Sequence, residues 1–211
     1  MERSHTRKGE LHMTKYIFFD MDGVLTTDTT GSYTTAKFFA DKFEIDFDEL
    51  FQYTKPFDSD IDAGKLTVNE VWAKVAEKYN KEFKDEYIRE AFLSTPIDSK
   101  MLEIVDKLKE NYKVGIITDN SIERANAIFD KNGFREIFDT IIISGEVKST
   151  KKSVEIFNIA AEKAGGECNE CVFIDNNPNN AKVADEAGFK GIWFDDQARD
   201  YDKLWNEIVG E

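Results

Sequence analysis

Residues 16–24, YIFFDMDGV, carry the signal that decides the fold. They open with four apolar residues, and continuous apolarity over so short a run is typical of a strand buried on both faces of a parallel sheet. Asp20 and Asp22 follow directly and are separated by one residue, so they share a face where the strand ends. We therefore expect a buried strand that delivers two carboxylates to the edge of a sheet.

The rest of the chain repeats this alternation of short apolar runs and helical patterns. Further buried strands are predicted at residues 114–117, 140–143, 171–174 and 191–194. Stretches with helical periodicity lie between and after them, at residues 101–108, 122–129, 154–161, 181–187 and 204–209. Such alternation is typical of a parallel sheet covered by helices on both faces. The predicted fold class is α/β, a doubly wound parallel sheet of five strands.

The connection after the first strand is too long for a simple loop. Roughly seventy residues separate that strand from the helix near Asp98, and a structureless loop of this length is rare in a compact domain. Thr67 and Glu70 fit a helix capping box, and Pro96 favours a return to extended chain. Helical patterns fill the segment, at residues 36–43, 49–53, 68–79 and 85–92. We therefore expect a small helical insert.

These patterns divide the chain into three parts. Residues 13–33 and 94–211 are expected to form the α/β core, and residues 34–93 a helical cap. Residues 1–12, MERSHTRKGELH, are polar and lack periodicity, and they resemble an expression leader rather than part of the fold.

Composition excludes several classes of function. The chain of 211 residues has 42 acidic and 28 basic side chains and a formal charge of −14, which disfavours nucleic acid and anionic membranes as partners. No apolar run approaches the length of a membrane span, and we expect a soluble cytoplasmic protein. The two histidines, His5 and His12, both precede the predicted fold, which argues against a Ser-His-Asp triad or a histidine zinc site.

The chain has two cysteines, Cys168 and Cys171, which form one CxxC sequence. A structural zinc site would need further soft ligands, and a redox pair usually opens a helix, whereas Cys171 begins an apolar strand. We therefore expect a buried thiol beside a loop thiol in a reducing compartment.

A polar residue follows each predicted strand, namely Asp20, Thr118, Ser144, Asp175 and Asp195. Ligands bind outside the carboxyl ends of the strands in an open parallel sheet, so these side chains can meet in one crevice. The same residue types are also favoured at turns and helix N-caps. For Ser144 and Asp195 taken alone, turn chemistry is the favoured interpretation.

The carboxylates and lysines near this crevice indicate a phosphoryl site. Asp20, Asp22 and Asp175 would crowd together, and a hard divalent cation with oxygen ligands would compensate their charge. Lysines follow the third strand, and we expect at least one of them to open a helix at the edge of the crevice: Lys148, Lys151 and Lys152. Neither GxxxxGK[ST] nor GxGxxG occurs after a strand, which disfavours nucleoside triphosphates and dinucleotides.

In order along the chain, these motifs resemble those of the haloacid dehalogenase-like hydrolase superfamily. The resemblance extends from Lys15 to Trp193, and the predicted insert is similar to a cap placed after the first motif. The four matching segments are DMDGV at 20–24, ITDN at 117–120, SGEVKSTK at 144–151 followed by EIF at 155–157, and VFID at 172–175 followed by Asn180.

The resemblance implies a role for each matching residue. Asp20 would be the nucleophile that forms an aspartyl-phosphate, and Asp22 the acid that protonates the leaving oxygen and then activates water. Thr118 would bind the phosphoryl oxygens, and Lys151 would neutralise charge between the phosphate and the nucleophile. The implied cofactor is Mg²⁺, held by Asp20, the backbone carbonyl of Asp22, and Asp175.

Three positions depart from the family pattern. Asn176 stands where a second acid often follows the fourth motif, which predicts weaker metal binding. Asp119 is at a position that is more often neutral, and it joins Thr118 and Lys151 as a predicted substrate-binding residue. Lys152 replaces a common proline, so either Lys151 or Lys152 can face the phosphate.

The resemblance predicts a Mg²⁺-dependent phosphatase that acts on a small phosphorylated metabolite. A haloacid dehalogenase lacks the second acid, so Asp22 argues against that alternative. A phosphomutase or a degenerate ligand-binding member remains open. A phosphoacceptor receiver module shares the sheet and the residue types, but it lacks a helical insert and carries its acceptor aspartate on a middle strand. The sequence defines neither the substrate nor the oligomeric state, because cap loops determine specificity.

Overall fold

The computed structural model describes residues 13–62 and 65–210, so the suggested leader at residues 1–12 lies outside it. Five parallel strands form one sheet in the order β3-β2-β1-β4-β5. The strands are β1 (Tyr16–Phe19), β2 (Lys113–Thr118), β3 (Thr140–Ile143), β4 (Cys171–Asp175) and β5 (Lys190–Trp193). The chain builds outward from β1 to β3 and then returns to the other side of β1. This order confirms the predicted doubly wound α/β fold and places the switch point between β1 and β4.

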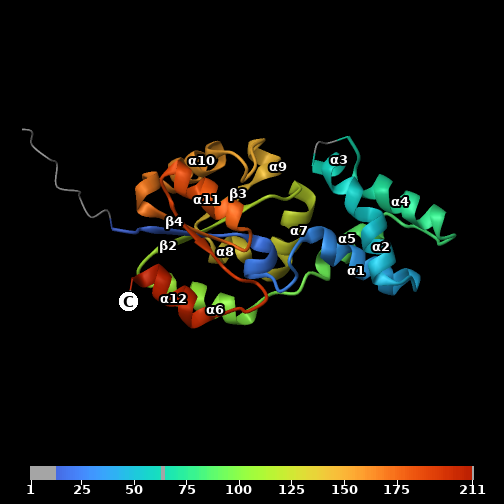
Figure 1. Cartoon of the computed structure of the whole chain (residues 1–211), viewed down its shortest axis with the longest axis horizontal. Coiled ribbons are helices and arrows are strands. Elements are labelled where there is room, and N and C mark those ends of the chain that lie inside the picture. Colours follow the sequence, from blue (N-terminus) through green and yellow to red (C-terminus); the bar gives the residue numbers. More distant parts are fainter. Residues whose placement is uncertain (1–12, 63–64, 211) are drawn as a thin grey trace, which may run out of the picture.

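Helices cover both faces of the sheet (Figure 1). One face carries α6 (Ser99–Leu108), α7 (Ile122–Asn132), α8 (Phe134–Ile137) and α12 (Tyr201–Val209). The other face carries α10 (Val154–Ala164) and α11 (Pro178–Ala187). All five helices that the sequence predicts in this half of the chain are present, each with one or both ends extended by up to three residues.

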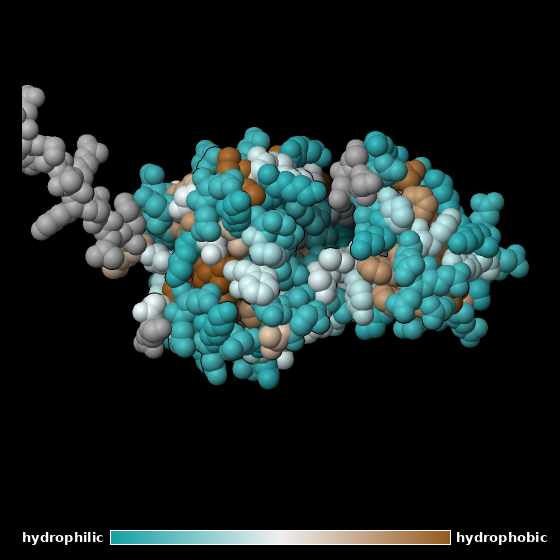
Figure 2. Space-filling view, viewed as in Figure 1, coloured by the Kyte–Doolittle hydropathy of each residue, from teal (hydrophilic) through white to brown (hydrophobic). Residues whose placement is uncertain are grey.

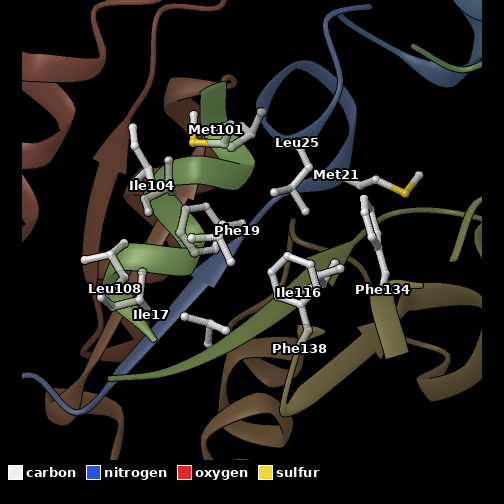
Figure 3. Close-up of a cluster of buried hydrophobic side chains, with 14 of the residues drawn as sticks. Ile17, Phe19, Met21, Leu25, Met101, Ile104, Leu108, Ile116, Phe134 and Phe138 are labelled. Carbon is white, nitrogen blue, oxygen red and sulfur yellow. The ribbon is translucent and has the colours of Figure 1, made fainter. Parts of the chain in front are cut away.

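Strand β1 supplies side chains to the cores on both faces. Ile17 and Phe19 belong to the cluster under α6, whereas Phe18 belongs to the cluster under α10 and α11. Figure 3 shows Phe19 near Ile104 of α6 and Ile17 near Leu108 of the same helix. Burial on both faces explains why the sequence of β1 is continuously apolar rather than alternating.

The segment between β1 and α6 forms a helical lobe with its own core. Its elements are α1 (Gly31–Phe43), α2 (Phe47–Thr54), η2 (Lys55–Phe57), α3 (Asp58–Asp62), α4 (Val68–Lys78) and α5 (Glu86–Leu93). In that core Phe39 stacks on Trp72, with ring centroids 4.1 Å apart. The capping box of Thr67 and Glu70 is confirmed at the start of α4. The lobe packs against the rest of the protein through α5 and α7, at the right of Figure 1.

Helix α1 begins at Gly31, five residues before the predicted start of its helix at residue 36. Thr30 is the N-cap, and its side chain accepts a hydrogen bond from the backbone of Tyr33. A helix cap needs no apolar periodicity, so the hydrophobic pattern used for the prediction did not reveal this first turn.

The chain passes between the two lobes twice, and the two connections pair with each other. Thr26 and Ile97 form an isolated antiparallel bridge. Flanking backbone hydrogen bonds join Thr27 to Pro96 at 3.0 Å and Asp98 to Leu25 at 2.9 Å. The two connections therefore form a short paired hinge between the lobes, which also pack together through α5 and α7.

A turn that the sequence did not predict, η1 (Met21–Leu25), follows β1 directly, and its backbone is not helical at Asp22 and Gly23. Gly23 takes a positive φ of 78° there, and a Cβ atom at this position would lie 2.2 Å from Nδ2 of Asn176. Glycine is therefore required both by the backbone conformation and by the close approach of Asn176. Short helices without a strong periodic signal were also missed, namely α3, α8 and α9 (Ser144–Val147).

No helix in residues 13–62 and 65–210 is long and apolar enough to cross a membrane. On the face drawn in Figure 2 the surface is mostly hydrophilic, with apolar residues scattered among polar ones.

Candidate active site

Four of the predicted site residues lie buried at the carboxyl edge of the sheet. Asp20 follows β1, Thr118 ends β2 and Asp175 ends β4, while Lys151 comes from the turn between α9 and α10. Each of the four has at most 5% of its surface exposed. The register explains this arrangement, because β1 pairs in parallel with both β2 and β4 and their ends lie side by side.

Lys151 joins two of the carboxylates. Its Nζ lies 2.6 Å from Oδ1 of Asp20 and 2.8 Å from Oδ2 of Asp175. Lys152 is exposed, so Lys151 is the lysine that the structure brings to the buried carboxylates. The prediction that one of these lysines opens a helix is wrong, because α10 begins at Val154 with Ser153 as its cap. The lysines occupy the turn before that cap, and Lys148 ends α9 with a φ of 57°.

Backbone and amide donors hold Asp175. Its Oδ1 accepts from the backbone N of Asn177 at 2.7 Å, and its Oδ2 accepts from Nδ2 of Asn180 at 3.0 Å. Asp20 is held in the same manner, because its Oδ1 accepts from the backbone N of Met21 at 2.7 Å. These donors fix the carboxylates before any ligand binds.

Asp119 holds the backbone of the turn that carries Lys151. Its carboxylate accepts hydrogen bonds from the backbone N of Lys151, at 3.0 and 3.3 Å. The acid at this unusual position therefore anchors the turn that carries Lys151. Whether Asp119 also contacts a substrate stays a prediction.

Burial shapes the charge of this cluster. It raises the pKa of Asp20 well above its ordinary value, because desolvation outweighs the attraction of Lys151 and the carboxylate of Asp175 adds repulsion. Burial alone would lower the pKa of Lys151, but the carboxylates of Asp20 and Asp175 raise it and keep the ammonium charged. With both carboxyl groups ionised, Asp20 and Asp175 would share one ammonium, and the cluster would carry an excess negative charge.

This excess charge fits a bound cation. In residues 13–62 and 65–210 no group of three or more His, Cys, Asp or Glu side chains is arranged to hold a metal ion. The predicted ligand set is smaller, since it combines the carboxylates of Asp20 and Asp175 with the backbone carbonyl of Asp22. Such hard oxygen donors in a negatively charged cluster are the ligands that Mg²⁺ prefers.

Asp22 belongs to a neighbouring group of side chains. Arg124 of α7 donates two hydrogen bonds to its carboxylate, both at 2.7 Å. Asn120 donates from Nδ2 to Oδ2 of Asp22 at 2.9 Å and to Oγ1 of Thr118 at 3.0 Å. Thr118 and Asp22 are therefore linked through Asn120, and the Thr118 hydroxyl still carries a hydrogen that it can donate.

The sequence reasoning did not identify Arg124 or assign a role to Asn120. A signal was nevertheless present, because Arg124 stands in the first turn of a predicted helix, where the helix dipole disfavours a cation. A basic residue at such a position indicates a specific acidic partner.

The remaining polar residues at the strand ends, Ser144 and Asp195, hydrogen-bond to backbone groups. Ser144 accepts a hydrogen bond from the backbone N of Asn120 at 3.0 Å. Asp195 accepts from the backbone N of Gln197 at 3.0 Å and of Ala198 at 3.1 Å. The Asp195 contacts agree with the turn chemistry favoured for that residue, whereas Ser144 contacts the backbone at the end of the neighbouring strand and caps no helix.

Asn176 links the core to the first connection. Its Nδ2 donates to the backbone carbonyl of Thr29 at 3.3 Å and to Oδ2 of Asp196 at 3.1 Å. An aspartate could not donate these bonds, which gives a physical reason for the amide at this position. The predicted effect of Asn176 on metal affinity stays a prediction.

The two cysteines lie at the opposite end of β4 from the site. Both are free thiols, Cys168 partly buried and Cys171 buried, as predicted. Burial raises the pKa of Cys171 to about 12, which disfavours a reactive thiolate.

The sheet order places the buried carboxylate–lysine cluster at the strand ends, where open α/β proteins bind their ligands. The chain belongs to the haloacid dehalogenase-like hydrolase family, whose model matches residues 14–188. It is 29% identical over 163 residues to the pyrimidine 5'-nucleotidase YjjG of Escherichia coli, and the match covers 71% of each chain. It is also 26% identical over 113 residues to the pyrophosphatase PpaX of Bacillus velezensis, which is 53% of this chain and 49% of that protein.

The fold has close structural counterparts. One is the HAD family enzyme bt-2542 of Bacteroides thetaiotaomicron in complex with magnesium and inorganic phosphate, with a TM-score of 0.69 and 24% identity, covering 90% of this chain and 98% of that one. Another is the putative HAD-hydrolase YfnB of Bacillus subtilis bound to magnesium, with a TM-score of 0.73 and 15% identity, covering 93% and 99%. These likenesses confirm the fold.

Proposed function

We propose that this hydrolase is a Mg²⁺-dependent phosphatase that acts on a small phosphorylated metabolite through an aspartyl-phosphate. The observation that carries the proposal is the buried pair Asp20 and Asp175, joined by Lys151 at the strand ends. YjjG and PpaX are named as a nucleotidase and a pyrophosphatase, which supports phosphate-ester or phosphoanhydride chemistry.

The first half of the proposed reaction transfers the phosphoryl group to the enzyme. A carboxylate oxygen of Asp20 attacks phosphorus, and the bond between phosphorus and the leaving oxygen breaks. A proton from Asp22 goes to the leaving oxygen, which departs as an alcohol. Thr118 and Lys151 stabilise the charge on the transferred group by a hydrogen bond and by an ammonium.

The second half restores the enzyme. Water attacks the phosphorus of the aspartyl-phosphate, Asp22 accepts a proton from that water, and the bond between phosphorus and Asp20 breaks. Inorganic phosphate leaves and Asp20 is again a carboxylate, so each turnover consumes one water. When bound by Asp20, Asp175 and the carbonyl of Asp22, Mg²⁺ would supply positive charge against the phosphoryl oxygens.

The helical lobe would act as the cap of this site. Residues 34–93 are the proposed cap, and residues 13–33 and 94–211 the catalytic core, with the paired connections as the hinge. A lid of this kind excludes water and contacts the leaving group. We propose that it selects the metabolite.

A screen of phosphorylated metabolites for phosphate release, with and without Mg²⁺, tests the proposal. Wild-type enzyme should release phosphate only with Mg²⁺, and Asp20→Asn should abolish release because an amide is a poor nucleophile. Wild-type turnover in Asp20→Asn would rule out the mechanism. Phosphate transferred to a second position of the substrate, without release, would indicate a mutase instead.

A further inference from the structure

Arg124 is buried at a place where a helix does not favour a cation. It lies in the first turn of α7, its side chain is 6% exposed, and the dipole of the helix opposes its charge. A buried guanidinium needs a compensating partner. That partner is Asp22, whose side chain is 13% exposed.

The contacts between these groups fix the plane of the Asp22 carboxylate. Nη1 of Arg124 donates to Oδ2 and Nη2 donates to Oδ1, each at 2.7 Å. Asn120 closes the arrangement, because its Oδ1 accepts from Nη1 of Arg124 at 2.8 Å while its Nδ2 donates to Oδ2 of Asp22. A bidentate pair of this kind defines orientation as well as position.

The guanidinium of Arg124 also contacts both connections to the helical lobe. A Cβ atom at Gly31, the first residue of α1, would lie 2.7 Å from Cζ and 2.9 Å from Nε of Arg124. On the returning connection, Oγ1 of Thr95 lies 3.4 Å from Nη2. Nε is buried and donates no hydrogen bond to any of the described residues. The guanidinium therefore lies between Asp22 and the start of the lobe.

We propose that Arg124 is a positioning residue that sets the Asp22 carboxylate and couples its placement to the seating of the helical lobe. The inference rests on the proposed function, in which Asp22 delivers a proton to the leaving oxygen. Proton delivery requires hydrogen-bond reach, and small displacements of a catalytic group have large effects on rate. Arg124 acts through Asp22 and through the contact with Gly31.

Two substitutions disturb this arrangement in different ways. Arg124→Lys keeps a positive charge but cannot form the bidentate contact. Gly31→Ala leaves Arg124 and Asp22 themselves unchanged. Its added Cβ atom would clash with the guanidinium of Arg124 and displace it. The φ of Gly31 is not positive, so alanine fits the backbone, and the displaced group is the far end of a flexible side chain. Arg135→Gln on α8 is the matched control, because that arginine side chain is 51% exposed.

The leaving group provides a readout that a merely structural role would not change. The value of kcat/KM reports the transfer of the phosphoryl group to Asp20. In that step 4-nitrophenolate can leave without being protonated, whereas an alkoxide leaving group needs a proton. We expect Arg124→Lys and Gly31→Ala to lower kcat/KM for the best alkyl phosphate of the screen by ~10–100-fold. For 4-nitrophenyl phosphate we expect a change within ~3-fold, with an unchanged Tm for Gly31→Ala. Arg135→Gln should match the wild type.

The possible outcomes separate the inference from the proposed function. Equal losses on both substrates, or no loss on either, would overturn the role of Arg124. A selective loss in Arg124→Lys without one in Gly31→Ala would overturn the coupling to the lobe. An inactive wild-type enzyme would overturn the proposed function itself.

Discussion

Lys151 is the residue on which the buried cluster depends most directly. Its ammonium contacts Asp20 and Asp175, and all three side chains are at most 7% exposed. Removing the cation would leave two carboxylates facing each other in a medium that solvates charge poorly.

We expect Lys151→Gln to lower the free energy of unfolding by about 3–5 kcal/mol without Mg²⁺, because it breaks a buried ion pair. Turnover should fall by ~10²–10³-fold, the usual effect of removing one group that stabilises transition-state charge. Urea unfolding and phosphate release measure the two effects. Lys152→Gln is the control, since Lys152 is exposed, and equal losses in both variants would contradict the assignment of Lys151.

The sequence allowed residues such as Asp20, Thr118 and Asp175 to be placed, because each ends a strand in a parallel sheet with predictable edges. It could not place the partner of Asp22. Arg124 reaches Asp22 from a helix more than a hundred residues away, and this contact depends on the turn η1 and on the packing of α7. Periodicity describes which face of a helix is buried, but not which buried polar groups meet.

At the scale of elements, a network of side chains ties the loop after β5 to the hinge. Arg199 donates to the backbone carbonyls of Gly23 at 3.1 Å and Val24 at 3.0 Å, and it pairs with Asp98. Asp98 also accepts from Tyr201 at 2.7 Å, and it caps α6. The turn η1, the returning connection and the last helix are thereby held together.

The network makes stability depend on pH in a defined direction. Burial alone would raise the pKa of Asp98, but hydrogen bonds from Tyr201, the backbone of Met101 and Arg199 hold it below its ordinary value of 3.8. A carboxyl whose pKa is lower in the folded state contributes its full stabilisation above the unfolded value. That stabilisation is lost as the pH falls through the lower folded value.

We therefore expect Asp98→Asn to lower the free energy of unfolding at pH 7 by about 2–3 kcal/mol, because it removes charge-assisted hydrogen bonds. The difference from the wild type should shrink as the pH is lowered below 3.8. Urea unfolding at several pH values measures it. Asp106→Asn, at an exposed position of α6, should show neither effect. A difference that stays constant down to low pH would show that the Asp98 charge does not stabilise the fold.

At the scale of the whole molecule, two lobes with largely separate cores are joined by a short paired hinge and pack together through α5 and α7. The strands of the larger lobe were predictable because each is buried on both faces and reads as a short apolar run. The extra turn of α1 and the short helices α3, α8 and α9 were not, because their residues are determined by caps and tertiary contacts. The pairing of Thr26 with Ile97 could not be predicted either, since one isolated bridge leaves no alternation of apolar and polar residues in the sequence.

This hinge allows the role of the smaller lobe to be tested by its removal. Thr26 and Ile97 are paired, so the chain ends that remain after deletion lie close together and a short glycine-containing turn between Asp28 and Thr95 can join them. The deletion exposes Ala127 of α7, which packs into the core of the helical lobe, so Ala127→Ser is included to keep that surface polar. We expect a folded core that still hydrolyses 4-nitrophenyl phosphate slowly, because Asp20, Thr118, Lys151 and Asp175 all lie outside the lobe.

In the variant without the helical lobe, discrimination among metabolites should largely disappear. The groups proposed to contact the leaving group of the substrate are then gone, and water can enter the site. Circular dichroism and cooperative thermal unfolding establish that the core is folded, and the metabolite screen is then repeated with both proteins. A folded core with the substrate profile of the full chain would show that specificity resides in the sheet edge. Similar activity on all screened metabolites, with hydrolysis of 4-nitrophenyl phosphate retained, would assign substrate selection to the lobe. It would also assign the bond-breaking chemistry to the strand ends.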